Sequence, residues 1–242
     1  MQTLAIIQAR MGSTRLPGKV MLDLAGEPML VRNVNRVGRS RTVRKVVIAT
    51  TALSTDDAIE HVCLQYGWSC FRGSENDVLD RCYKAAVAYD AEIVVRITSD
   101  CPLIEPTVID QVIQAFLQRQ PEIDYVSNTL PERTFPRGLD TEVIRFEALE
   151  LAWRVDTNPV WRVHVTPYIY HNPGLFHLYS VVNDEDYSHM RWTVDTFEDL
   201  EFVRRIYEHF DSDRFSWRDV LLLLEKHPEW LDINQHVQQK TM

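Results

Sequence analysis

Residues 6 to 19 read IIQARMGSTRLPGK, and this stretch carries the clearest indication of the fold. The apolar run from Leu4 to Ile7 is typical of a buried β-strand, and a short basic loop follows it directly. Open α/β sheets bind their ligands outside the carboxyl ends of the strands. The stretch therefore predicts a polyanion site, with a nucleoside triphosphate as the expected ligand and three cations to hold it: Arg10, Arg15 and Lys19.

The loop does not match the common phosphate-binding motifs. A P-loop has four residues between its glycines and a Ser or Thr after the lysine, whereas five residues separate Gly12 from Gly18 and Val20 follows Lys19. No G-x-G-x-x-G motif occurs anywhere in the chain. The two glycines still allow backbone N–H groups to approach a phosphate. The alternative is a surface turn that is basic by chance.

The chain has 242 residues, 45% of them hydrophobic, which is enough for one large α/β domain. The net charge is -9, but residues 1 to 50 contain nine Lys or Arg against two Asp or Glu. A local basic region in an acidic protein suits a small anionic ligand and argues against binding to a nucleic-acid backbone. Most of four further arginines are expected to form a solvated helix face: Arg32, Arg36, Arg39 and Arg41.

Strand and helix patterns alternate through the first half, which predicts a parallel sheet with helices on both faces. The expected strands are 4–8, 43–50, 69–71 and 92–98, and the expected helices are 29–37, 54–66, 77–89 and 106–119. The second of these helices is expected to open with a capping box at residues 54–57. Beyond residue 125 the pattern becomes irregular, and shorter strands at 141–144 and 176–182 predict a mixed sheet.

No segment has the length and apolarity of a membrane helix or of a secretory signal, so a soluble cytoplasmic protein is expected. The cysteine spacing matches no zinc motif, and reduced, partly buried thiols are expected at Cys63, Cys70, Cys82 and Cys101.

Two aspartates follow predicted strands. Asp100 ends the apolar segment in RITSDCPL (96–103), at the same sheet edge as the basic loop, where a carboxylate is suited to hold Mg²⁺ against triphosphate oxygens. Asp195 lies in RWTVDTFEDL (191–200), where a further short strand is expected to lead into a helix. The alternatives are that Asp100 caps a turn and that Asp195 is a helix N-cap.

The string Ala-Arg-x-x-Ser-x-Arg-Leu-Pro-Gly-Lys at residues 9 to 19 resembles the cytidylyltransferases that activate sugar acids as CMP-sugars, most closely their SpsF-like branch. The resemblance implies a Rossmann-like, GT-A-like nucleotidyltransferase fold with three layers and a mostly parallel, mixed central sheet. It also implies that the loop cradles the CTP phosphates, with contacts from Ala9, Arg10, Gly12, Ser13, Arg15 and Lys19.

The same resemblance implies a Mg²⁺ cofactor held by Asp100 and Asp195. The family string Asp-Thr-x-Glu-Asp-Leu usually has Pro where this chain has Phe197, a change that leaves the carboxylate of Asp195 in place. Catalysis is expected to depend on positioning and charge, from Lys19, Arg10, Arg15 and Asp100.

Residues 72 to 81 resemble the family segment that lies over the base, which implies nucleotide contacts from Arg72, Gly73, Ser74 and Arg81, with Ser99 nearby. A plain helix-capping loop is the alternative there. The strings PRGLDTE (136–142) and WRVHVT (161–166) resemble acceptor-binding segments, although the family usually has Glu where this chain has Val163. The acceptor-site candidates are Arg137, Asp140, Glu142, Arg162 and His164, with Arg137 or Arg162 holding a substrate carboxylate.

The expected activity is transfer of CMP from CTP to a sugar acid or similar acceptor, for surface polysaccharide or glycan synthesis. A single domain is expected over 1–242, with a CTP-binding half (1–122) and an acceptor-binding half (123–242). No binding to nucleic acid or membrane is expected, and the expected assembly is a homodimer. One alternative is a glycosyltransferase that uses a nucleotide-sugar donor and an Asp-x-Asp motif at residues 184–186. The other is a regulatory nucleotide-binding subunit without turnover.

Overall fold

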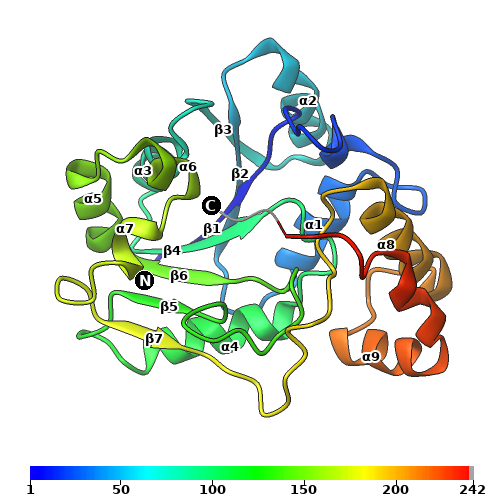
Figure 1. Ribbon diagram of the computed structural model, residues 1–242. Coiled ribbons are helices and arrows are strands. Elements are labelled where there is room, and N and C mark those ends of the chain that lie inside the picture. The colour runs from blue at the N-terminus through cyan, green and yellow to red at the C-terminus, as the bar shows by residue number, and fades with distance from the viewer. Residues whose placement is uncertain (240–242) are drawn as a thin grey trace.

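The computed structural model describes residues 1–239, and a single sheet of seven strands forms its centre (Figure 1). The strand order is β3-β2-β1-β4-β6-β5-β7, so strands from both halves of the chain share one sheet. Within the described residues only β6 runs against the other strands. The strands are β1 (Thr3–Gln8), β2 (Lys45–Thr51), β3 (Ser69–Gly73), β4 (Ile93–Thr98), β5 (Tyr125–Ser127), β6 (Glu142–Arg145) and β7 (Leu178–Ser180).

Helices cover both faces of the sheet, which confirms the predicted three-layer architecture (Figure 1). One face is packed by α1 (Met29–Val37), α2 (Asp57–Tyr66), α4 (Pro106–Leu117), α8 (Phe197–Phe210) and α9 (Trp217–Lys226). The other face is packed by α3 (Val78–Ala88), α5 (Phe146–Val155) and α7 (Pro167–Tyr170), with α6 (Pro159–His164) beside α3. Short 3₁₀ turns lie at Lys19–Met21 (η1), Ser54–Asp56 (η2) and Pro228–Ile233 (η3).

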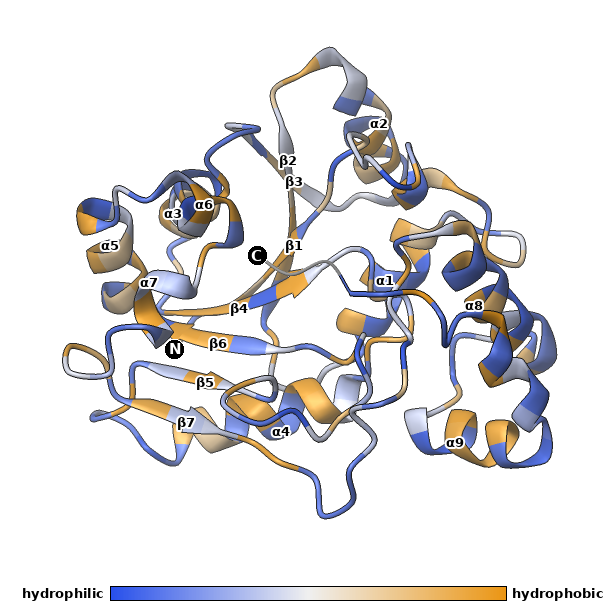
Figure 2. Cartoon of the chain, in the orientation of Figure 1, coloured by the Kyte–Doolittle hydropathy of each residue, from blue (hydrophilic) through white to orange (hydrophobic). Residues whose placement is uncertain are grey.

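The central strands are buried on both sides, which explains their unbroken apolar sequences. In β1, Leu4 and Ile6 belong to one core cluster while Ala5 and Ile7 belong to the cluster on the opposite face. This division follows from the two-residue period of side chains along a strand. Figure 2 shows β1 and β4 mainly in the hydrophobic colour, in agreement with that arrangement.

Three local predictions are wrong. The capping box expected at the start of α2 does not form: residues 54–56 make a 3₁₀ turn, and the N-cap Asp56 makes no capping hydrogen bond to that helix. The short strand expected before Asp195 is only an isolated bridge between Arg137 and Arg191. Most of the four arginines do not form a solvated helix face: Arg36 is fully buried in an ion pair with Glu105, Arg32 pairs with Asp213, and Arg39 is half-buried.

The thiol prediction is confirmed, because all four cysteines are free, three of them buried and Cys70 half-buried. None of the described helices is long and apolar enough to cross a membrane.

Candidate active site

The basic loop after β1 is shaped by hydrogen bonds within the loop and by a buried aspartate. The carbonyl of Met11 accepts from the N–H groups of Ser13 and Gly18, at 2.8 and 2.9 Å, and Gly18 has a φ of 67°, in the left-handed region. Asp56 accepts a hydrogen bond from the Met11 N–H at 2.7 Å and others from Thr50 and Thr51. Asp56 thus fixes the start of the loop against the end of β2.

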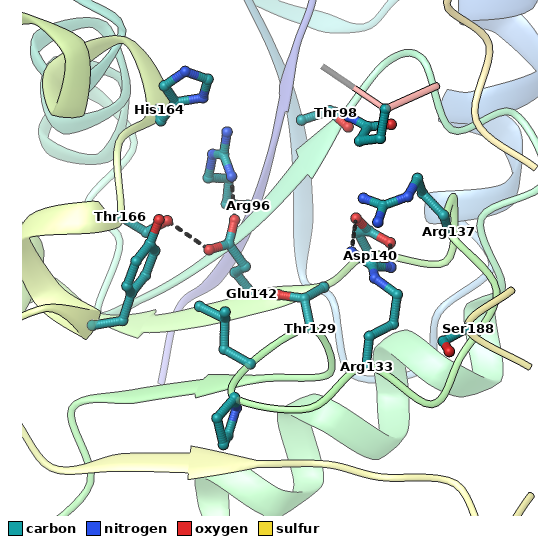
Figure 3. Close-up of a pocket in the computed structure, with 14 residues that line it drawn as sticks. Arg96, Thr98, Thr129, Arg133, Arg137, Asp140, Glu142, His164, Thr166 and Ser188 are labelled. Atoms are coloured by element: carbon teal, nitrogen blue, oxygen red, sulfur yellow. Dashed lines mark hydrogen bonds and ion pairs between the residues drawn. The ribbon is translucent and has the colours of Figure 1, made fainter. Parts of the chain in front are cut away.

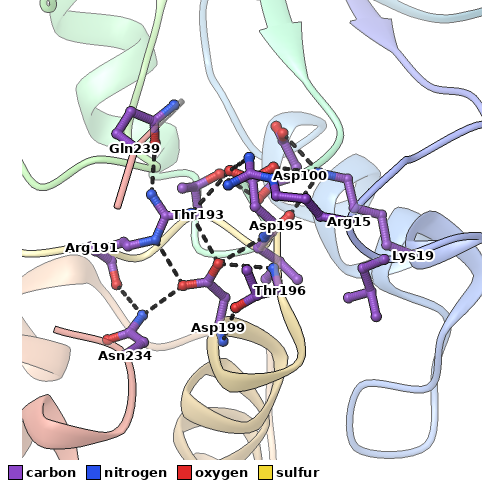
Figure 4. A network of polar contacts seen from close by, with 12 residues as sticks. Arg15, Lys19, Asp100, Arg191, Thr193, Asp195, Thr196, Asp199, Asn234 and Gln239 are labelled. Carbon is purple, nitrogen blue, oxygen red and sulfur yellow. Dashed lines mark hydrogen bonds and ion pairs between the residues drawn. The ribbon is translucent and has the colours of Figure 1, made fainter. Parts of the chain in front are cut away.

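Lys19 is the buried cation of the loop, and its ammonium group lies between two carboxylates (Figure 4). The Lys19 Nζ atom is 3.1 Å from Asp100 Oδ2, 2.9 Å from Asp195 Oδ1 and 2.7 Å from the carbonyl oxygen of Val194. Burial acts to lower the pKa of Lys19, but the two aspartates outweigh it and the pKa is raised. Lys19 is therefore protonated at neutral pH and supplies a positive charge at this edge of the sheet.

The two aspartates meet because residues 193 and 194 bind the backbone of Asp100. The N–H of Val194 and the hydroxyl of Thr193 both donate to the Asp100 carbonyl oxygen, at 2.8 and 3.1 Å. Asp195 is not an N-cap, since Thr196 caps α8 in a capping box with Asp199. The Asp195 carboxylate is therefore not used to cap the helix and instead contacts the cations of the site.

Arg191 and Asp199 hold Asp195, and sequence reasoning did not select either of them. Asp199 is fully buried, forms a bidentate ion pair with Arg191, and accepts from the N–H groups of Asp195 and Thr196. Arg191 Nη2 also donates to Asp195 Oδ2 at 3.0 Å. Both residues belong to the RWTVDTFEDL string, in which only the central Asp195 was predicted to serve the site.

Asp195 is surrounded by three cations. Arg15 Nη2 lies 2.8 Å from Asp195 Oδ2, beside the contacts from Arg191 and Lys19. Burial alone would raise the pKa of Asp195, but these cations outweigh it and lower the pKa. Asp195 is therefore an ionised carboxylate at neutral pH.

The donor set fits Mg²⁺. One oxygen of Asp100 and one of Asp195 converge on a single point, and Mg²⁺ is commonly held by one or two carboxylates together with substrate phosphates. Among residues 1–239 no cluster of three or more His, Cys, Asp or Glu is suited to a metal, so the remaining ligands would be phosphate or water oxygens.

The other residues expected at the nucleotide lie around this centre in different settings. Arg10 is exposed with Glu75 at 3.8 Å, the Ser13 hydroxyl accepts from the Leu16 N–H, and Ser99 is buried against Gln8. Ala9 is buried at the end of β1, and Gly12 is exposed in the loop. The loop thus exposes Arg10 and Gly12, whereas Arg15 and Lys19 both contact the Asp195 carboxylate.

The segment expected over the base is partly occupied by internal contacts. Arg72 pairs with Asp57 and Glu60, each at 2.7 Å, and we therefore do not include it among the residues proposed to bind the nucleotide. Arg81 is buried and donates to the Ser74 carbonyl oxygen at 2.6 Å. A Cβ on Gly73 would lie 2.9 Å from Arg81 Cγ, so this glycine makes room for the Arg81 side chain.

A cavity of about 700 Å³ adjoins this centre at the ends of β4 and β6 (Figure 3). Its wall contains four of the five predicted acceptor residues: Arg137, Asp140, Glu142 and His164. Two further arginines, which were not predicted from the sequence, also line the cavity. Arg96 forms an ion pair with Glu142, and Arg133 forms a bidentate ion pair with Asp140. Arg96 lies inside the RITSDCPL string, whereas no motif indicated Arg133.

Arg137 and Arg162 differ in their contacts, which separates the two candidates for binding a carboxylate. Arg162 does not line the cavity: it pairs with Asp77 at 2.9 Å and donates to the carbonyl oxygens of Trp153 and Asp156. Arg137 lines the cavity, and its guanidinium has no hydrogen-bond or ion-pair partner within the described part of the chain. Arg137 is thus the better placed of the two.

The acceptor loop is tied directly to the Asp195 segment. The N–H of Arg137 donates to the Met190 carbonyl at 2.9 Å, and the N–H of Trp192 donates to the Arg137 carbonyl at 2.7 Å. Gly138, with a φ of 115°, packs so closely that a Cβ would lie 2.7 Å from the Trp192 carbonyl carbon. The cavity and the carboxylate pair are therefore held in one fixed arrangement.

The mostly parallel sheet, with a basic loop after its first strand, defines a nucleotidyltransferase fold. The family model described as "Cytidylyltransferase" matches residues 4–236. The chain therefore belongs to the cytidylyltransferase family.

Similar proteins place it in the SpsF-like branch. The spore coat polysaccharide biosynthesis protein SpsF of Bacillus subtilis (strain 168) is 35% identical over 234 residues, which cover 93% of this chain and 95% of that protein. A solved cytidylyltransferase structure from Leptospira borgpetersenii serovar Hardjo-bovis (strain JB197) is 36% identical, with a TM-score of 0.92 and all of both chains covered. A structure described as CMP:2-keto-3-deoxy-manno-octonic acid synthetase complexed with CTP shares the fold, with a TM-score of 0.65, 20% identity, and coverage of 86% of this chain and 99% of that chain.

Proposed function

We propose that the protein transfers CMP from CTP to an acceptor that carries a carboxylate, with a sugar acid as the expected class, and releases pyrophosphate. The observation that carries this proposal is the convergence of Lys19, Asp100 and Asp195 next to a cavity lined by Arg137. Membership of the cytidylyltransferase family supports CTP as the nucleotide. The distant synthetase structure with bound CTP supports both this nucleotide and a sugar acid as the acceptor class.

The chemistry follows from the charges of the site. An acceptor oxygen attacks the α-phosphorus of CTP and forms the new P–O bond, the acceptor hydroxyl gives its proton to water, and the bond to pyrophosphate breaks so that pyrophosphate leaves. Arg10, Arg15 and Lys19 bind the phosphates and stabilise the charge that develops on pyrophosphate. Bound Mg²⁺, held by Asp100 and Asp195, would supply additional positive charge to the same oxygens. Arg137 would orient the acceptor by binding its carboxylate.

The test of the nucleotide is thermal unfolding with each of the four nucleoside triphosphates, with and without Mg²⁺. A ligand at about one hundred times its dissociation constant stabilises a protein by about 2.7 kcal/mol, which is measurable as a shift of the midpoint. We expect CTP to stabilise most, and Mg²⁺ to increase its effect. A response to a UDP- or GDP-sugar with Mn²⁺, and none to CTP, would contradict the proposal and favour a glycosyltransferase.

That glycosyltransferase alternative has weaker support in the structure. Its Asp-x-Asp candidate, residues 184–186, is exposed in the loop after β7, where Asp186 accepts from the Ser188 N–H. Neither Asp184 nor Asp186 lines the cavity or contacts Lys19 within the described residues.

Removal of the central charges is expected to abolish turnover. Lys19→Ala and Asp100→Asn should each lower kcat by about 100- to 1000-fold, the size of effect seen when one donor to a developing oxyanion is lost. Both variants should remain folded, because Asp195 keeps its ion pairs with Arg15 and Arg191. Pyrophosphate release measures turnover, and circular dichroism measures whether the variants are folded. Near-normal turnover in either variant would contradict the proposed function.

The wider biological setting is also proposed. The SpsF relative supports a role in surface polysaccharide or glycan synthesis, and a cytoplasmic homodimer is the expected form. Light scattering coupled to size exclusion would measure the mass in solution, and a monomer would contradict the homodimer.

A further inference from the structure

The ammonium group of Lys19 has three protons to donate, and contact with the two carboxylates competes for them with contact to a phosphate. An ammonium group has three donors and no acceptor, and the contacts to Val194, Asp195 and Asp100 use all three. Contact with a phosphate, which the proposed function requires, therefore needs Lys19 to give up at least one of these partners.

The same contacts place Lys19 at the point where a divalent cation would bind. Lys19 Nζ contacts Oδ1 of Asp195 and Oδ2 of Asp100, whereas Arg15 and Arg191 both contact the other oxygen of Asp195. The side chains of Lys19 and Asp195 are only 11% and 13% exposed. An ammonium group and a divalent cation at this buried point would repel each other strongly, and two carboxylates with neither would also be unfavourable.

We propose that Lys19 is an exchangeable counter-cation for the Asp100 and Asp195 pair, so that divalent-metal binding to this pair depends on nucleotide. The triphosphate draws Lys19 away from the two oxygens, and Lys19 then neutralises phosphate charge instead. This inference rests on the proposed function for its nucleotide. It does not involve Arg191, because the bidentate pair with buried Asp199 keeps that guanidinium in place.

The test removes the competing cation and measures metal binding without nucleotide. Lys19→Met deletes the charge and keeps most of the side-chain volume, and Mn²⁺ serves as a probe that prefers the same oxygen ligands as Mg²⁺. Free Mn²⁺ is measured by electron paramagnetic resonance. We expect Lys19→Met to bind Mn²⁺ at least about tenfold more tightly than the wild type, because the repulsion is gone. Lys19→Gln is the second variant and should shift affinity in the same direction.

The matched control is Arg10→Met, which removes a cation from the same loop without touching either carboxylate. It should bind Mn²⁺ as weakly as the wild type. Adding CTP should tighten Mn²⁺ binding to the wild type by more than it does for Lys19→Met.

Two results would overturn the inference: equal Mn²⁺ affinity in the wild type and both folded Lys19 variants, or an equal gain in Arg10→Met. The proposed function fails separately, through the absence of any CTP-induced stabilisation of the wild type. Failure of one proposal is therefore distinguishable from failure of the other.

Discussion

At the scale of single residues, Arg137 and Arg162 show how the structure assigns different roles to two similar arginines. Arg137→Met should raise the KM for the acceptor about 10- to 100-fold, because a hydrogen bond to a charged group contributes about 1.5–3 kcal/mol. Its unfolding midpoint should change little, since the guanidinium has no hydrogen-bond or ion-pair partner within residues 1–239. Pyrophosphate release with a sugar-acid acceptor that the wild type turns over, together with thermal unfolding, measures the two effects.

Arg162→Met is the comparison for Arg137→Met. It leaves Asp77 and two carbonyl oxygens without their donor, so it should lower the unfolding midpoint and leave the acceptor KM nearly unchanged. The opposite pattern in the two variants would mean that Arg162 binds the acceptor carboxylate.

At the scale of structural elements, the close packing of the acceptor loop on the Asp195 segment limits what residue 138 can be. Gly138→Ala places a Cβ within 3 Å of backbone atoms of Trp192 and Thr193, at a φ that L-residues rarely adopt. We expect a loss of about 2–4 kcal/mol in the free energy of unfolding and a large loss of activity. Denaturant unfolding measures the first effect.

Gly174→Ala is the matched control, because nothing lies within 4 Å of a Cβ at that position. It should be nearly neutral in stability and activity. Similar effects of the two substitutions would show that the packing at Gly138 is not responsible.

For the whole molecule, the ionised carboxylates of Asp195 and Asp140 make the free energy of unfolding depend on pH in the acid range. Burial alone would raise the pKa of Asp195 and of Asp140, but the arginines and Lys19 beside them lower both. The unfolded chain binds protons at these positions at a higher pH than the folded chain does. Their stabilisation is therefore complete above the ordinary carboxyl pKa of about 4 and is lost as pH falls through the lowered values.

The unfolding midpoint should accordingly decrease as the pH is lowered below about 4. Asp140→Asn removes one of the two carboxylates and should flatten this part of the profile. Thermal unfolding from pH 7 to pH 2 measures both curves, and parallel curves would rule out a contribution from Asp140.

Local sequence patterns were sufficient for most of the fold. The apolar run before residue 8, the helical spacing of Met29–Val37 and the strand–helix alternation predicted the parallel part of the sheet, since burial repeats with the period of each element. The prediction of a strand before Asp195 was wrong because that segment pairs only through an isolated bridge at Arg137 and Arg191.

Local periodicity and a motif of adjacent residues are enough to predict the α/β fold, the basic loop and the two aspartates. Which charges meet depends on the three-dimensional packing. Lys19 contacts Asp100 and Asp195, which lie 81 and 176 residues away in the sequence. Asp199 holds Asp195 through Arg191. Arg137 lines the cavity, whereas Arg162 pairs with Asp77. Such pairings depend on how distant segments pack together, which neither the period of a helix nor the spacing of a motif encodes.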